Sequence, residues 1–173
     1  MSNKQRTLLE TRRFAVVEEI VTRRDGQTAS LQFVKHPGTV AILPMVDDDQ
    51  VCLILSRRLT VGKTLIEIPA GTREPNESPL ETARRELAEE TGYRAAQFDE
   101  LAAYYPSPGI TDERIWVFVA RGLTAGEHAR EPNEEIENFV VKWSDVMQML
   151  SRGEIEDGKS IVALLTYDRT RSP

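Results

Sequence analysis

The first third of the chain alternates between apolar and polar positions, as β-strands do. Residues 14–38 read FAVVEEIVTRRDGQTASLQFVKHPG, in which two strand-like runs flank Asp25-Gly26, a dipeptide typical of tight hairpin turns. Residues 38–58 repeat the arrangement around the acidic residues 47–49. The pattern therefore predicts two successive β-hairpins, with a boundary near His36-Pro37-Gly38.

A helical pattern replaces this alternation after residue 78. Ser78 has the properties of an N-cap, Pro79 suits the first helical turn, and Glu81 completes a capping box. Gly92 is placed as a C-terminal stop. These signals predict one helix that begins after Ser78 and ends before Gly92.

The remaining chain returns to strands and closes with helices. Residues 98–123 predict strands broken by a Pro-Ser-Pro-Gly turn, and residues 131–143 predict an acidic loop that enters a further strand. Two closing helices are expected, with Ser144 and Asp157 as their N-caps. This order of elements predicts an α/β (α+β) sandwich built on a mixed sheet.

Composition and charge narrow the class of protein. A chain of 173 residues with 40% hydrophobic and 29% charged residues is typical of one globular domain. The net charge of -6 argues against generic binding to nucleic acid or to an anionic membrane. Cys52 is the only cysteine, so an intrachain disulfide is impossible. With no secretory signal and no apolar run long enough to cross a bilayer, we expect a cytoplasmic protein.

The predicted helix carries an unusual cluster of like charges. At helical spacing Glu86, Glu89 and Glu90 fall within an arc of roughly 100°, beside the apolar stripe that contains Ala83 and Leu87. Like charges at such positions repel by about 0.2–0.5 kcal/mol per pair. A solvated acidic face is one reading. A site for a hard cation is the other, and the position beside the buried face favours it.

Carboxylate oxygens are the ligands that Mg²⁺ and Mn²⁺ prefer. Mg²⁺ keeps several waters when bound to protein and takes further ligands from substrate phosphates. A magnesium site on this helix, with manganese as the alternative, therefore indicates phosphate chemistry.

The spacing of these residues resembles the signature of the Nudix hydrolases. Gly71 is followed after five residues by Glu77, and after seven more by the segment 85–93, which reads RELAEETGY. Tyr93 departs mildly from the pattern, because that position is normally aliphatic. The resemblance implies a Nudix-type α/β/α sandwich that hydrolyses a nucleoside diphosphate linked to another group. We call residues 71–93 the Nudix box.

Roles for individual residues follow from the same resemblance. Glu86 and Glu90 correspond to the principal metal ligands of the family. Glu89 corresponds to a further ligand, acting directly or through water, and the carbonyl of Ala70 contributes as well. Arg85 belongs to the catalytic set as a support that bonds to Glu77 or to the ligands.

Segments outside the box resemble the ADP-ribose pyrophosphatase branch of the family. These are residues 65–71, LIEIPAG, and residues 104–120, YYPSPGITDERIWVFVA. The branch implies hydrolysis of ADP-ribose to AMP and ribose 5-phosphate. The alternatives are another nucleoside diphosphate sugar, such as GDP-mannose or ADP-glucose, and a module that binds ADP-ribose without cleaving it. Residues 1–40 resemble the β-rich region that this branch uses to form a homodimer, which leaves 41–173 as the Nudix domain.

The branch also indicates where the substrate binds. Arg58 corresponds to an arginine that contacts substrate phosphate, a task that suits the forked guanidinium. Glu67 is a candidate for contact with the terminal ribose or an amino group, with a structural role as the alternative. Tyr104 or Tyr105 is a candidate for stacking near the nucleobase. Alternation along a strand allows only one of the two to face the site.

The resemblance to this branch also implies a general base on the acidic loop that follows the box. The loop reads EPNEEIENFVV, and Glu134 is the first choice and Glu135 the second for the carboxylate that takes a proton from the attacking water. A solvated acidic loop without a catalytic role is the alternative for either residue.

Overall fold

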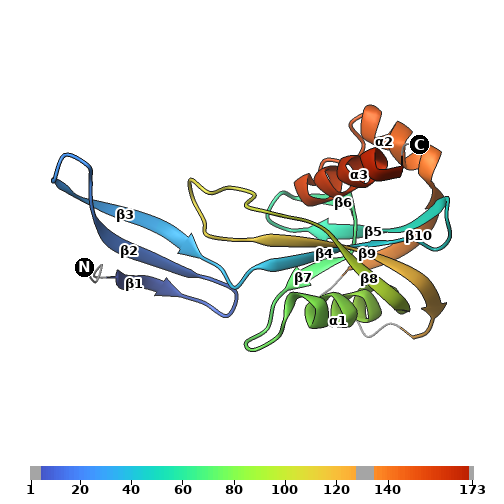
Figure 1. The fold of residues 1–173 in the computed structure, drawn as a ribbon, viewed down its shortest axis with the longest axis horizontal. Coiled ribbons are helices and arrows are strands. Elements are labelled where there is room, and N and C mark those ends of the chain that lie inside the picture. Colours follow the sequence, from blue (N-terminus) through green and yellow to red (C-terminus); the bar gives the residue numbers. More distant parts are fainter. Residues whose placement is uncertain (1–4, 128–134, 172–173) are drawn as a thin grey trace.

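The computed structural model describes residues 5–127 and 135–171, and in these ranges the chain forms ten strands and three helices (Figure 1). The strands are β1 (Gln5–Glu10), β2 (Ala15–Thr22), β3 (Thr28–Lys35), β4 (Thr39–Pro44), β5 (Gln50–Arg58), β6 (Lys63–Glu67), β7 (Ala70–Thr72), β8 (Tyr93–Tyr104), β9 (Ile115–Ala125) and β10 (Ile136–Lys142). The helices are α1 (Pro79–Thr91), α2 (Trp143–Ser151) and α3 (Gly158–Arg171).

Two sheets form the body of the molecule. One has the order β7-β4-β9-β8, with β4 and β9 parallel and the other neighbours antiparallel, and the second has the antiparallel order β10-β5-β6. Helix α1 lies on one side of these strands, and α2 and α3 lie on the other (Figure 1). The predicted α+β sandwich on a mixed sheet is therefore confirmed.

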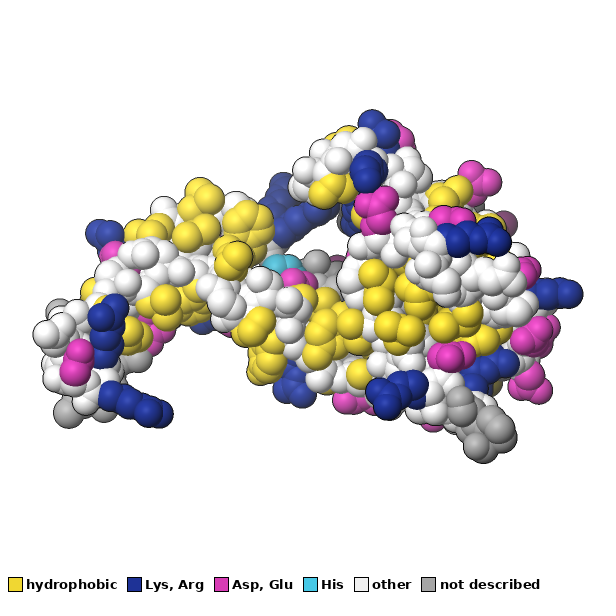
Figure 2. Space-filling model, turned by 90° about the horizontal axis from the view of Figure 1, so that it is seen from above, with side chains coloured by type: hydrophobic (Ala, Val, Ile, Leu, Met, Phe, Trp, Pro, Cys, Tyr) yellow, Lys and Arg dark blue, Asp and Glu magenta, His cyan; other side chains and the backbone are white. Residues whose placement is uncertain are grey.

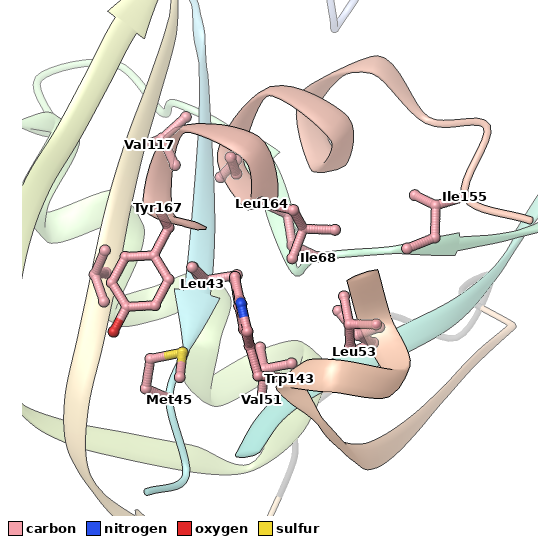
Figure 3. Close-up of a cluster of buried hydrophobic side chains, with 14 of the residues drawn as sticks. Leu43, Met45, Val51, Leu53, Ile68, Val117, Trp143, Ile155, Leu164 and Tyr167 are labelled. Atoms are coloured by element: carbon pink, nitrogen blue, oxygen red, sulfur yellow. The ribbon is translucent and has the colours of Figure 1, made fainter. Parts of the chain in front are cut away.

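The alternation of side chains along β4 explains why helices cover both of its faces. Val40 and Ile42 pack with Ala83 and Leu87 of α1 in one buried cluster. Ala41 and Leu43, the alternate residues, belong to a second cluster, which β5, β9, α2 and α3 complete (Figure 3). Because successive side chains of a strand point to opposite faces, an apolar residue at every position requires cover on both sides.

Helix α1 begins and ends where its sequence predicts. The Ser78 hydroxyl accepts a hydrogen bond from the Glu81 amide, and the Glu81 carboxylate accepts one from the Ser78 amide, which completes the capping box. Gly92 has a φ of 77° and its N–H donates to the Ala88 carbonyl. Glycine adopts this left-handed conformation readily, so it terminates the helix without strain.

Strands β1, β2 and β3 form a separate antiparallel sheet, here called the arm, that projects from the body (Figure 1). The hairpin predicted at Asp25-Gly26 joins β2 to β3, and Gly26 has a φ of 80°. Val34 links the arm to the segment after β8, because its N–H donates to the Ile110 carbonyl at 2.8 Å and its carbonyl accepts from the Asp112 N–H at 3.1 Å.

The arm leaves many of its apolar side chains exposed to solvent, and hydrophobic side chains gather on it in Figure 2. The large ones are Leu8, Leu9, Phe14, Ile20 and Leu31.

Two local predictions are wrong. The turn at residues 47–49 forms, but β4 and β5 do not make a hairpin: beyond one bridge between Met45 and Val51 they belong to different sheets. Ser144 is not an N-cap, because α2 begins one residue earlier at Trp143, whose N–H bonds to the Asp49 carbonyl at 2.7 Å. Asp157 does cap α3, accepting from the Ser160 amide at 2.9 Å.

Candidate active site

A cleft of about 490 Å³ lies where β7, the end of β8 and the first turn of α3 meet. Its walls carry two cationic and two acidic side chains together with Tyr104. The lining residues are Thr39, Arg58, Ala70, Gly71, Thr72, Tyr104, Pro106, Glu113, Ile115, Asp157, Gly158, Lys159 and Val162.

The Nudix box reaches this cleft through β7, all three residues of which line it. Glu86 lies directly under Gly71, where an added Cβ atom would stand only 1.9 Å from the Glu86 carboxyl carbon. Glu90 accepts a hydrogen bond from the Ala70 amide at 2.9 Å. Both glutamates are buried, with 8% of Glu86 and 4% of Glu90 exposed. Glu86 and Glu90 therefore lie against the residues of the cleft wall, which does not fit a solvated acidic face, whereas 38% of the Glu89 side chain is exposed.

Arg85 organises the acidic face of α1. Its Nε and Nη2 atoms donate to the two Glu77 carboxylate oxygens, each at 2.9 Å. Its Nη1 atom donates to Glu86 at 2.6 Å and to Glu89 at 3.0 Å. These hydrogen bonds lower the pKa of Glu77 to about 2 and raise the pKa of Arg85. Arg85 thus holds three carboxylates in fixed positions, as charge-assisted forks do.

The residues of α1 and β7 fit a divalent cation by donor type. The Glu86, Glu89 and Glu90 carboxylates and the Ala70 carbonyl supply only oxygen, which Mg²⁺ and Mn²⁺ prefer. Among the described residues, no three acidic, histidine or cysteine side chains already converge on one point. Arg85 and the Ala70 amide bond to oxygens of these same carboxylates, so an ion bound there competes with those contacts.

Arg58 and Glu67, both predicted to contact substrate, bind each other. Arg58 forks onto Glu67, with Nε to Oε1 at 2.7 Å and Nη2 to Oε2 at 2.6 Å. The Glu67 side chain is 1% exposed, whereas 40% of the Arg58 side chain is exposed. Arg58 therefore faces the cleft, and Glu67 lies behind it. The substrate contacts of both remain predictions.

Of the two candidate tyrosines, only Tyr104, the last residue of β8, lines the cleft. Tyr105 is 55% exposed and lies outside the lining. The Tyr104 hydroxyl is buried and has no hydrogen-bond partner within residues 5–127 and 135–171. Burial raises the pKa of Tyr104 to about 12, and the nearby charges of Asp157 and Glu113 add to the effect. The neutral hydroxyl is a hydrogen-bond donor available to a ligand in the cleft.

The two candidates for the general base are not equally placed in the structure. Glu134 lies outside the described residues. Glu135 is exposed just before β10, and its backbone carbonyl accepts from the Arg57 N–H at 3.2 Å. The assignment of either as the base remains a prediction.

Sequence reasoning missed two charged residues of the cleft, Lys159 and Glu113. Lys159 contacts Glu67 and lies 3.0 Å from Asp157, and Glu113 accepts a hydrogen bond from the Thr39 hydroxyl at 2.5 Å. A signal existed for Lys159, because a cation in the first turn of a helix opposes the helix dipole and needs another reason. Nothing in the local pattern distinguishes Glu113 from a surface charge.

Comparisons with known proteins agree with this geometry. A family model described as NUDIX domain matches residues 35–165. The chain is 37% identical over 148 residues to the ADP-ribose pyrophosphatase of Bacillus subtilis (strain 168), and the aligned region covers 84% of this chain and 80% of the relative. It is 30% identical over 162 residues to the GDP-mannose pyrophosphatase of Escherichia coli (strain K12 / DH10B), and the aligned region covers 87% of this chain and 84% of the relative.

A solved structure shares the fold. It is described as an ADP compounds hydrolase and superposes with a TM-score of 0.82 at 21% sequence identity, covering 98% of this chain and 92% of that one. None of the described helices is both long and apolar enough to span a membrane.

Proposed function

The chain belongs to the Nudix family, and on this premise we propose that it hydrolyses the pyrophosphate bond of ADP-ribose to AMP and ribose 5-phosphate. The observation that carries the proposal is the position of the Nudix box. Its buried glutamates lie against the wall of a cleft that also presents Arg58 and Lys159. The similarity to an ADP-ribose pyrophosphatase over most of both chains supports the choice of substrate.

Nudix hydrolysis uses a divalent metal ion, and we propose Mg²⁺, with Mn²⁺ as the alternative. Glu86, Glu89 and Glu90, together with the carbonyl of Ala70, would hold it. A bound divalent ion supplies a water of lowered pKa and neutralises the charge of the phosphate oxygens.

The remaining roles belong to side chains of the cleft. Arg58 binds a phosphate of the substrate, since donors beyond those on Glu67 remain on its guanidinium. Tyr104, which also lines the cleft, faces the nucleoside diphosphate sugar. Glu134, or alternatively Glu135, takes the proton of the attacking water as its oxygen adds to phosphorus and the P–O–P bridge breaks.

The assembly and the compartment are proposals as well. The exposed apolar residues of the arm support a homodimer formed through residues 1–40, because monomers rarely expose such a patch. Cys52 is fully buried and cannot form a disulfide within the chain, which suits a reducing compartment such as the cytoplasm.

The first test is AMP or GMP release from ADP-ribose, ADP-glucose and GDP-mannose, with Mg²⁺ and with EDTA. We expect metal-dependent release with a preference for ADP-ribose, and loss of turnover in Glu90→Gln with the circular dichroism spectrum retained. A preference for GDP-mannose would replace the substrate and keep the metal site, and the similarity to GDP-mannose pyrophosphatase makes it the second candidate. Binding of ADP-ribose without cleavage would make the protein a sensor.

A further inference from the structure

Lys159 occupies a position where a cation is disfavoured. It lies in the first turn of α3, where the peptide N–H groups create a partial positive charge. Its side chain is only 11% exposed, although lysine is rarely buried unless it is paired. Because both the helix dipole and burial disfavour a charged lysine here, the groups around Lys159 must stabilise its charge.

Its partners are two carboxylates. The Nζ atom contacts Glu67 Oε2 and lies 3.0 Å from Asp157 Oδ1. The other Asp157 oxygen accepts from the Ser160 hydroxyl at 2.6 Å, and the same hydroxyl accepts from the Ile68 N–H at 2.9 Å. The Ser160 hydroxyl therefore ties the first turn of α3 to Ile68, the residue after β6, and these hydrogen bonds hold Lys159 close to Glu67.

Glu67 connects Lys159 to the cleft. Its Oε2 atom is shared between Lys159 and the Nη2 atom of Arg58, and its Oε1 atom binds Arg58 Nε. Because Glu67 is 1% exposed, water does not screen its charge. Arg58 is the partly exposed end of this chain of contacts.

The balance of charge decides what Lys159 does. A buried carboxylate that faced Arg58 alone would cancel the positive charge that Arg58 presents to an anion. Lys159, which lines the same cleft, neutralises Glu67, while the N-terminus of α3 offsets Asp157. We propose that Lys159 is a positioning residue: through Glu67 it orients the Arg58 guanidinium and leaves its charge available to the diphosphate of the substrate. The identity of that anion rests on the proposed function.

Three variants test this inference. Lys159→Met removes the charge, and Lys159→Arg retains it. The control is Lys63→Met, which removes a charge from an exposed pair, since Lys63 and Glu156 lie 2.9 Å apart with 58% and 53% of their side chains exposed. The measurements are kcat and KM for ADP-ribose with Mg²⁺, and the Kd of ADP-ribose by calorimetry in EDTA.

We expect Lys159→Met to raise KM and Kd about tenfold while kcat stays within about threefold, because the lost interaction acts on binding of the ground state. Lys159→Arg should recover most of the affinity, and Lys63→Met should stay within about twofold of wild type, as an exposed pair contributes little. An unchanged Kd in Lys159→Met would overturn the inference. If that variant does not fold, Lys159→Gln takes its place.

A double-mutant cycle with Glu67→Gln separates positioning from direct contact. If Lys159 acts through Glu67, then Lys159→Met in the Glu67→Gln background should raise Kd by less than about threefold, because the two residues form one unit. The same tenfold loss in both backgrounds would show that Lys159 binds the substrate itself.

The outcomes keep this inference apart from the proposed function. Wild-type protein that binds ADP-ribose and cleaves none refutes the function, and the Kd values still decide the role of Lys159. If another sugar nucleotide is preferred, it replaces ADP-ribose in all the measurements.

Discussion

Gly71→Ala should disable the active site while leaving the fold almost intact. The new methyl group would stand 1.9 Å from both the carboxyl carbon and Oε1 of Glu86, and 2.3 Å from Oε2. Non-bonded carbon atoms settle at about 3.5–4.0 Å, so the Glu86 carboxylate must retreat by roughly 1.5–2 Å. The retreat breaks its 2.6 Å hydrogen bond with Arg85.

Gly71→Ala should reduce activity far more than it reduces stability. A displacement of about 1 Å in catalytic geometry lowers the rate by about 10²-fold, so kcat/KM should fall by at least that factor. The clashing atoms are the far end of a flexible side chain, which can rotate away. The loss of stability should therefore be near the lower end of the 1–3 kcal/mol typical of overpacking, that is, about 1 kcal/mol. In a domain of this size about 1 kcal/mol corresponds to 2–4 °C in Tm.

The assay is AMP release from ADP-ribose together with thermal unfolding. Gly109→Ala is the matched control, because a Cβ atom there meets nothing within 4 Å. A Gly71→Ala enzyme that keeps kcat/KM within about threefold would refute the view that Glu86 must lie against β7. A fall in Tm of more than about 10 °C would show that the backbone, and not the carboxylate, yields to the methyl group.

Three further predictions address the box, the cleft and the arm. Arg85 lowers the folded-state pKa of Glu77 from 4.5 to about 2, so this stabilisation is complete above pH 4.5 and is lost as the pH falls toward 2. The free energy of unfolding in urea should therefore decrease more steeply between pH 5 and pH 2 in wild type than in Arg85→Met, and equal slopes would contradict the ion pair. Tyr104→Phe removes a hydroxyl that bonds to none of the described residues, so its free energy of unfolding should stay within about 1 kcal/mol, and a loss above about 2 kcal/mol would reveal a hidden partner. Leu31→Lys places a charge on the apolar surface of the arm and should convert a dimer to monomers in light scattering, whereas Leu59→Lys, outside the arm, should not; an unchanged mass for Leu31→Lys would contradict the proposed interface.

Helix α1 was predictable because every signal that defines it is local. The capping box needs only Ser78 and Glu81, and the stop needs only Gly92. The spacing of Glu86 and Glu90 within the Nudix box follows in the same way from one helix, whereas Gly71 lies in β7 and Glu77 precedes α1. A pattern of spacing suffices when a single element holds all its members.

Strand pairing was not predictable in this way. Strands β4 and β5 follow each other across a tight turn, yet β4 pairs with β9 in parallel, with Thr39 opposite Ile115. Both strands are buried on both faces, so their apolar residues do not indicate which neighbour they take. The choice depends on the packing of α1 on one side and α3 on the other, which is not encoded in the turn.

The same limit explains what was missed in the cleft. Lys159 and Glu67 are 92 positions apart, and only the folded sheet brings them into contact. Arg58 was identified through a resemblance that included its sequence context. No comparable context surrounds Lys159, whose role depends on a partner from a distant strand.

The segment from Glu67 to Gly71 connects the two halves of the site. Glu67 holds Arg58, the proposed phosphate ligand, and the Ile68 N–H donates to Ser160 in the first turn of α3. At its other end, the Ala70 N–H donates a hydrogen bond to the Glu90 carboxylate. The Glu86 carboxylate occupies the space that a side chain on Gly71 would fill. One short stretch of backbone thus contacts both Arg58 and the carboxylates of α1. A shift at either end therefore moves the carboxylates of α1, the proposed metal ligands, relative to Arg58, the proposed phosphate ligand. This coupling predicts that substitutions within the segment change metal affinity and substrate affinity together, whereas those at Lys159 change substrate affinity alone.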